Sequence, residues 1–441
     1  MLFSSTTRPL VRLFVVWLLI CAPLAAIAEG SGWVRRGSRP RRDSSSTEAT
    51  PSESLQFESK NDGAEQEPGR LPEGGGPELI TPNGESATTI NDSSVVPASA
   101  VNVSADQLAV DAFRLTKTAK SLEDYEAVLA ICEKALALDP TDQQREYVTQ
   151  LMSWGHNRRG QEYSKQGDEA AAEGKWEDSL NWEKKALADY ETAIELDATR
   201  WRAIHNRGVS KALMGEFDAA LADFDRALEL KPDYANAWFN RAEVRRETGK
   251  YQEALTDYEQ LLMLRPQDAA AYVGRGRCHA KLGNPIQAFA DFSSALGLSP
   301  QFADGYVFRG EVNAQLGEWE KAASDLRTSI KLDKNSGRAW RAIAWFTSTC
   351  PDVRFRDGEL ALVAAQRAIE LDGAANPLYL DALAAAYANA GQFDKAKEAL
   401  KKAIEQTPER QAPELTGRMA LYEAARPYRQ PEPTIQSVSH P

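Results

Sequence analysis

The chain has 441 residues, of which 26% are charged and 42% hydrophobic, and its formal net charge is −12. This moderate negative charge argues against a protein that coats nucleic acid. The length would allow two or three globular domains, but an internal repeat indicates one elongated array in their place.

The N-terminus has the composition of an export signal. Arg8 and Arg12 precede an apolar run that ends on Ala26-Ile27-Ala28. A basic start, a short apolar stretch and a small-x-small cleavage site predict a signal peptide over residues 1–28, and hence a periplasmic or secreted protein. The alternative is an uncleaved inner-membrane anchor, although the run is shorter than the roughly 20 residues of a membrane-spanning helix.

Residues 29–103 are rich in Ser, Pro, Gly and Glu and have no apolar period, which predicts a disordered linker. A basic cluster lies near its start. Two interpretations of this cluster stand: contact with an anionic membrane surface or wall polymer, and a solvated part of the linker. Its members are Arg35, Arg36, Arg39, Arg41 and Arg42.

A 34-residue period runs through the middle of the chain. Numbered from Trp201, each unit has small residues at positions 8, 15 and 20, and bulky residues at positions 4 and 24. Small residues at fixed offsets allow two helices to approach closely, and each helix pair then stacks on the next. The small residues are Gly208, Ala242, Gly276 and Gly310, then Gly215, Gly249, Gly283 and Gly317, then Ala220, Ala254, Ala288 and Ala322.

The array extends beyond this core in both directions. We expect about eight helix pairs and a capping helix over residues 104–426, followed by a disordered tail over 427–441. The unit that begins at Gly337 carries an insertion over 349–358. The longer spacing over residues 154–198 predicts one helix pair in which both helices are lengthened and the turn lies at Gly174. The alternative is a turn at Gly167-Asp168.

The pattern resembles the tetratricopeptide repeat. This resemblance implies an all-α fold, a right-handed superhelical solenoid of antiparallel helix pairs, with a surface that holds other molecules. The segment from Trp340 through Cys350-Pro351-Asp352 to Arg356-Asp357-Gly358, followed by Leu380–Leu383, also resembles a closing module of other exported bacterial repeat proteins. That second resemblance implies a Gram-negative envelope and no characterised activity.

Positions 7 and 23 carry a further pattern. Five units have arginine at the first and aspartate at the second, and three units have neither. Because the two residues occur together or not at all, we interpret them as structural ion pairs across each helix pair. The alternative is a row of arginines that grips an acidic ligand. The five pairs are Arg159–Asp189, Arg207–Asp223, Arg241–Asp257, Arg275–Asp291 and Arg309–Asp325.

No catalytic or metal-binding pattern stands out in the sequence. The four histidines are scattered, and Cys132, Cys278 and Cys350 lack metal-ligand spacing and fall at helix-packing positions, which predicts buried thiols. Gly274-Arg275-Gly276-Arg277 lies inside a predicted helix with no preceding strand, which excludes a phosphate-binding loop. We therefore predict neither catalytic activity nor a metal or cofactor.

The tetratricopeptide resemblance implies a ligand groove formed by positions 2, 5, 6, 9, 12 and 13 of each first helix. Asn, Arg and aromatic groups at these positions suit an extended peptide, and we expect Asn240, Arg277 and Arg341 to be open to solvent. Asn206 and Asn240 partly resemble a carboxylate clamp. The candidate residues are Arg202, His205, Asn206, Asn236, Phe239, Asn240, Arg246, Arg277, Lys281, Phe308, Arg338, Arg341 and Trp345.

The sequence thus predicts a non-catalytic scaffold or adaptor of the cell envelope that binds a protein or peptide, with no nucleic-acid partner. Membrane contact through the N-terminal segment or the basic cluster is part of the alternative, a membrane-tethered assembly factor. A subunit of an envelope enzyme or a glycan-processing complex is a third hypothesis.

Overall fold

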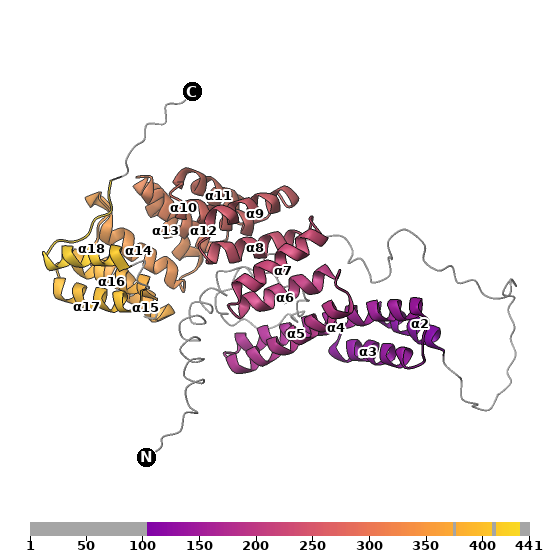
Figure 1. Cartoon of the computed structure of the whole chain (residues 1–441). Helices are drawn as coiled ribbons and strands as arrows, with labels where there is room; N and C mark the ends of the chain where they lie inside the picture. Colours follow the sequence, from indigo (N-terminus) through magenta and orange to yellow (C-terminus); the bar gives the residue numbers. More distant parts are fainter. Residues whose placement is uncertain (1–103, 374–375, 408–411, 433–441) are drawn as a thin grey trace, which may run out of the picture. The chain divides into compact units, whose positions relative to one another are not determined.

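A computed structural model describes residues 104–373, 376–407 and 412–432. The predicted signal peptide, the linker with its basic cluster, and residues 433–441 lie outside the described residues. Within the described ranges the secondary structure is helical and contains no strand (Figure 1). None of the described helices combines the length and hydrophobicity needed to cross a bilayer.

The described chain divides into two compact units, residues 104–234 and residues 235–432. The helices of the first unit are α2 (Ala105–Thr116), α3 (Leu122–Leu136), α4 (Asp142–Ala172), α5 (Trp176–Leu196), α6 (Trp201–Leu213) and α7 (Phe217–Leu230). The helices of the second unit are α8 (Ala235–Glu247), α9 (Tyr251–Leu264), α10 (Ala269–Lys281), α11 (Pro285–Leu298), α12 (Ala303–Gln315), α13 (Trp319–Leu332), α14 (Gly337–Thr349), α15 (Gly358–Asp372), α16 (Pro377–Asn389), α17 (Phe393–Glu405) and α18 (Ala412–Glu423).

The repeated small residues act as the periodicity predicts. A Cβ atom at Gly208 would lie 2.9 Å from the Phe224 ring, and one at Gly276 would lie 2.9 Å from the Phe292 ring. The two helices of a pair can therefore pack at this distance only where position 8 is small. Between the helices, Gly249 has φ +79°, a left-handed conformation that L side chains rarely adopt.

The lengthened pair consists of α4 and α5, which have 31 and 21 residues. Its turn is at Gly174, with φ +74°, whereas Gly167 lies inside α4; the alternative turn at Gly167-Asp168 is wrong. The first half of α4 has a second partner, because Val148 and Leu151 share a buried cluster with α2 and α3. This double role makes α4 longer than the sequence predicted.

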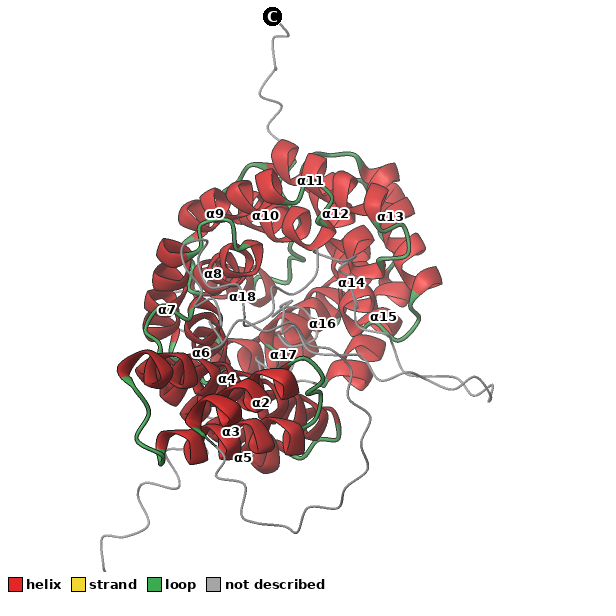
Figure 2. Cartoon of the chain, turned by 90° about the vertical axis from the view of Figure 1, so that its right-hand side faces the viewer, coloured by secondary structure: helices red, strands yellow, loops and turns green. Residues whose placement is uncertain are grey.

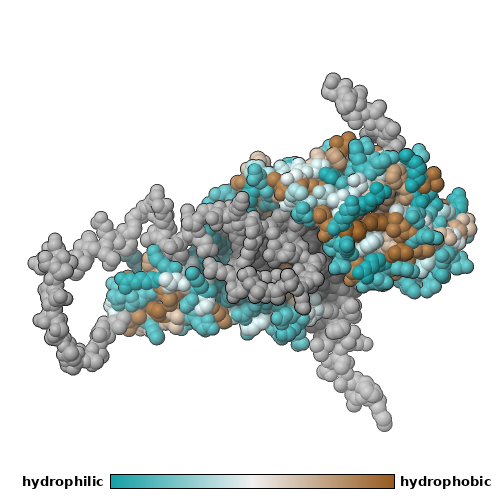
Figure 3. Space-filling view, turned by 180° about the vertical axis from the view of Figure 1, so that it is seen from behind, coloured by the Kyte–Doolittle hydropathy of each residue, from teal (hydrophilic) through white to brown (hydrophobic). Residues whose placement is uncertain are grey.

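In the second unit, the first helices of successive pairs contact one another. Figure 2 shows α10, α12, α14 and α16 on the inner side of this unit, with α9, α11, α13 and α15 outside them. We use "first-helix face" for the surface formed by positions 2, 5, 6, 9, 12 and 13 of α8, α10, α12, α14 and α16. The surface seen from behind is mostly hydrophilic, with smaller hydrophobic areas (Figure 3).

The insertion ends α14 and starts α15. Cys350 follows the last residue of α14, and a short 3-10 helix spans Val353–Phe355. The Asp357 side chain accepts a hydrogen bond from the Leu360 amide and so caps α15. The inserted segment therefore ends α14, forms a short 3-10 turn and begins α15.

The end of the chain differs from the sequence prediction. We expected a disordered tail from residue 427, but residues 428–430 pack against α14 and α16: the Tyr428 and Trp345 rings lie 5.8 Å apart, and Arg429 donates to Asn389 Oδ1 at 2.9 Å. The prediction is therefore wrong for these three residues. The Pro-rich composition predicted disorder, but the Tyr428 ring and the Arg429 guanidinium group make these contacts.

Candidate functional site

All five arginine–aspartate pairs are present, each within one helix pair. In every pair the aspartate accepts two hydrogen bonds from one guanidinium group, through Nε and Nη2. The shorter distance of each pair is 2.6–2.8 Å. We call this row of pairs the seam. Its aspartates are buried, so the seam holds the two helices of each pair together. We therefore interpret the seam as structural and not as a binding site for an acidic ligand.

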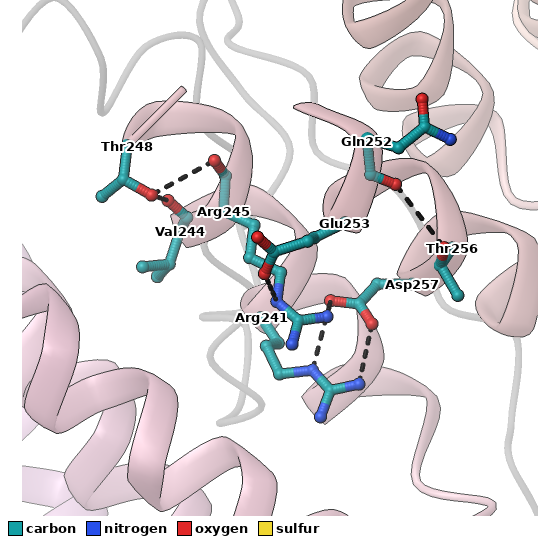
Figure 4. Close-up of polar contacts among 8 residues, drawn as sticks. All are labelled: Arg241, Val244, Arg245, Thr248, Gln252, Glu253, Thr256 and Asp257. Carbon is teal, nitrogen blue, oxygen red and sulfur yellow. Dashed lines mark hydrogen bonds and ion pairs between the residues drawn. The ribbon is translucent and has the colours of Figure 1, made fainter. Parts of the chain in front are cut away.

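A second donor reaches most of the seam aspartates from position 11, one turn after the arginine. Lys211 Nζ lies 2.8 Å from Asp223, Arg245 Nη1 lies 2.7 Å from Asp257, and Asn313 Nδ2 lies 3.0 Å from Asp325. Figure 4 shows the guanidinium groups of Arg241 and Arg245 converging on Asp257. This donor was not predicted from the sequence, although a polar residue at position 11 of each of these units was a usable signal.

The seam changes the ionisation of its members. Hydrogen bonds to the aspartates raise the pKa of Arg207, Arg275 and Arg309. Burial raises the pKa of Asp257, even though Arg241 and Arg245 favour its charged form. Asp257 is fully buried, so desolvation outweighs the attraction at this position.

The structure buries several residues that the sequence placed in an open groove. Asn236 and Asn240 lie one turn apart on α8, with exposures of 1% and 0%, and Phe239 shares a core cluster with Cys278 of α10. The prediction that Asn240 is open to solvent is therefore wrong. Position 5 of α8 packs against the next first helix, which the spacing within one unit could not reveal.

A buried polar cluster lies beside these residues. Arg246 Nη2 donates to Glu243 at 2.7 Å, and the Tyr258 hydroxyl also donates to Glu243. Gly274 makes this contact possible, because a Cβ at Gly274 would lie 2.3 Å from the Tyr258 ring. Burial alone would raise the pKa of Glu243, but Arg246 and Arg277 outweigh it and the pKa is lowered. Glu243 occupies position 9 of α8 and was not among the residues predicted for the groove.

Arg277 lies close enough to Glu243 to interact with it electrostatically, but it forms no ion pair of its own among the described residues. Its guanidinium group lies 5.4 Å from the centroid of the Phe308 ring, and Arg338 lies 5.1 Å from the same centroid. Arg338 pairs with Asp304 at 3.1 Å, whereas Arg277 makes no ion pair with any described residue. Burial, followed by repulsion from Arg246 and Arg338, lowers the pKa of Arg277 to about 10.

The remaining second-unit candidates lie on α10 and α14. Lys281 is exposed, at the end of α10. Arg341 forms an ion pair with Glu311 and its side chain is only 16% exposed, so the prediction that it is open to solvent is wrong. Trp345 stacks near both Tyr428 and Arg418, and Arg418 in turn forms two hydrogen bonds with Asp381, at 3.0 and 2.9 Å.

Three candidates belong to the first unit. Arg202 is exposed and lies over the Trp201 ring at 4.0 Å, whereas His205 is 2% exposed and packs against Phe224 and Tyr234. Asn206 donates to Asn157 Oδ1 at 3.0 Å. His205 is therefore a core residue rather than an open groove residue.

Cys132, Cys278 and Cys350 are buried free thiols. Burial raises the pKa of Cys132 and of Cys278 to about 12, which makes them unreactive as thiolates. Within the described residues, no group of three or more His, Cys, Asp or Glu side chains is arranged to hold a metal ion.

Two family models of the tetratricopeptide repeat match parts of the chain. The first matches residues 205–262 and 244–303, and the second matches residues 377–410. A search of curated proteins gives no match.

Solved structures with stacked helix pairs are similar to parts of the chain. A tetratricopeptide repeat protein from Parabacteroides merdae is 17% identical, with 60% of this chain and 98% of that one covered and a TM-score of 0.47. YrrB, described as a TPR protein with an unusual peptide-binding site, is 23% identical over 41% of this chain and 89% of its own, with a TM-score of 0.34. MamA from Desulfovibrio magneticus is 19% identical over 40% and 95%, with a TM-score of 0.35.

The family matches fall on helix pairs that follow the 34-residue period, with its small residues at the close approaches and its turns at glycine. The chain therefore contains tetratricopeptide repeats.

Proposed function

We propose that this chain is a non-catalytic scaffold of the cell envelope, and that its first-helix face binds an extended acidic segment of a partner protein around Arg277. Tetratricopeptide repeat proteins bind protein or peptide partners, and the chain is an interaction scaffold of this kind. The acidic ligand and the location are the parts that we propose.

The lack of an ion-pair partner for Arg277 among the described residues carries this proposal. Three arginines meet around Phe308 and Glu243, but Arg246 is paired with Glu243 and Arg338 with Asp304. The lowered pKa of Arg277 means that its surroundings disfavour the charged form. A carboxylate from a ligand would relieve this cost and form a charge-assisted hydrogen bond with the guanidinium group.

Neighbouring groups suit the rest of an extended ligand. The Phe308 ring lies between two guanidinium groups and offers an apolar surface to a ligand side chain. Exposed Lys281 can pair with a second acidic residue.

A pair of matched peptides tests the proposed ligand class. The first is a fluorescein-labelled nonapeptide in which Glu alternates with Ala and Phe, and the second has Gln in place of every Glu. Fluorescence anisotropy with the full mature chain should give an affinity about tenfold higher for the Glu peptide, with a difference that shrinks as salt is added. Equal affinities of the two peptides would contradict the proposal.

Export is supported by the basic start, the apolar run and the small residues that precede Glu29. N-terminal sequencing of the protein recovered from the producing cells tests it. A mature chain that begins near Glu29 supports cleavage and release. A chain that retains Met1 favours the membrane-tethered alternative.

A further inference from the structure

Residues 428–430 lie on the first-helix face of the second unit as a bound segment would. Tyr428 and Arg429 are both half-buried, and the contacts of the segment fall on Trp345 of α14, Asn389 of α16 and Arg418 of α18. Residues 431 and 432 beyond it are exposed. Figure 1 shows the chain leaving α18 and passing beside α14.

The C-terminal end of α14 binds the Arg429 guanidinium group and the Gln430 backbone amide. A helix leaves its last carbonyl groups without intrahelical partners, and this end carries partial negative charge. The insertion satisfies one of them, because the Asp357 amide donates to Thr347 O at 3.0 Å. The tail satisfies the next two: Arg429 Nη1 donates to Ser348 O at 2.7 Å, and the Gln430 amide donates to Thr349 O at 2.9 Å.

An aromatic slot lies beside this helix end. Arg418 is fixed by Asp381 and lies 5.3 Å from both the Trp345 and the Tyr428 ring centroids. The Tyr428 ring therefore meets an indole ring and a guanidinium group, both of which favour an aromatic side chain. Asn389 Oδ1 accepts a hydrogen bond from Nη2 of Arg429. These groups select an aromatic residue followed by arginine, in an extended backbone.

The tail satisfies this site only in part. Ser348 Oγ, Tyr422 Oη and Gln430 Oε1 are buried and have no hydrogen-bond partner among the described residues. Each such group retains the cost of desolvation without a compensating bond. A segment that also supplied partners for Ser348 and Tyr422 would bind more tightly than the tail does.

We propose that the first-helix face at α14 and α16, together with Arg418 of α18, is a second peptide-binding site, specific for an aromatic–arginine segment, and that residues 428–430 occupy it in cis. A partner segment of the same chemistry binds by displacing the tail. This site is separate from the Arg277 region and recognises the opposite charge, so the acidic-peptide test neither supports nor refutes it.

Full-length variants test the proposal with a labelled peptide that has the sequence of residues 426–434. The double substitution Tyr428→Ala with Arg429→Ala removes the side chains that hold the tail, and Glu432→Ala is the matched control at an exposed tail position. The double variant should bind the peptide about tenfold more tightly than the wild type or the control. A peptide with Ala at both of those positions should not bind.

Two further results decide between a binding site and a permanent structural cap. Asn389→Ala added to the double variant should weaken peptide binding severalfold, because the guanidinium group loses an acceptor. If the double variant unfolds, the single variant Arg429→Ala, which keeps Tyr428, must bind the peptide at least about threefold more tightly than the wild type. A folded variant that fails to bind the peptide would overturn the proposal.

Discussion

Arg275 and Arg277 are two residues apart on α10, and the fold treats them in opposite ways. Arg275 faces the seam, where Asp291 accepts two hydrogen bonds from it and raises its pKa. Arg277 faces the neighbouring first helices, where burial and two other arginines lower its pKa to about 10. On one surface of α10, Arg275 pairs with an aspartate and joins the two helices of a pair. On the other surface, Arg277 has no ion-pair partner among the described residues.

The comparison shows why counting arginines along the repeat is misleading. A seam arginine has its partner in its own unit, at a constant distance in sequence, so each unit carries a complete pair. On the first-helix face, Arg338 and Arg341 pair with acidic residues of the preceding repeat unit, whereas Arg246 pairs with Glu243 of its own helix. The period therefore predicts the seam, whereas the face is particular to each position.

The largest effect is expected from breaking the seam at its most buried point. Asp257→Ala leaves Arg241 and Arg245 without their shared acceptor and should lower the free energy of unfolding by about 3–5 kcal/mol. Arg241→Leu should be less damaging, because Arg245 still pairs with Asp257. Urea denaturation followed by circular dichroism measures both. Glu253→Ala is the control, since Glu253 is exposed and lies 3.6 Å from Arg245; a loss as large as that of Asp257→Ala would contradict the account.

The next effect concerns an ion pair that lies outside the seam. Burial raises the pKa of Asp381 to about 6, against the effect of Arg418. Because this pKa lies above the usual value of about 3.9, the contribution of Asp381 to stability is largest below pH 4 and decreases as pH rises to 6. The difference in free energy of unfolding between the wild type and Asp381→Asn should fall by up to about 3 kcal/mol over this range and then stay level. A difference independent of pH would show that Asp381 titrates normally.

A smaller effect is expected from the packing that brings the seam together. Gly276→Ala places a Cβ 2.9 Å from the Phe292 ring and should destabilise the fold by about 1–3 kcal/mol. Gly297→Ala is the matched control, because Gly297 is also helical but has open space at its Cβ, and it should stabilise the fold by up to about 1 kcal/mol. Thermal unfolding of the two variants should shift in opposite directions. Equal shifts would mean that position 8 is not a close approach.

These contrasts also show what could be predicted from the sequence. The helix pairs, the glycine turns and the five ion pairs follow from residues that recur within one unit, such as Gly208, Arg207 and Asp223. Burial of Asn240 could not be predicted, because it depends on packing between repeat units. The Glu243–Tyr258 contact could not be predicted either, because it depends on the missing side chain of Gly274 in the next repeat unit. The contacts of Tyr428 and Arg429 join segments distant in sequence, and neither residue belongs to the repeat.

The most direct test of this division is one affinity measurement on two neighbouring substitutions. The labelled Glu nonapeptide is titrated by fluorescence anisotropy into full-length Arg277→Met and Arg275→Met, each first shown to be folded by circular dichroism. Arg277→Met should weaken binding about tenfold or more, because the ligand carboxylate loses its partner, whereas Arg275→Met should remain within about threefold of the wild type. Equal losses in the two variants, or a larger loss in Arg275→Met, would contradict the claim that the seam is structural and that the first-helix face binds the ligand.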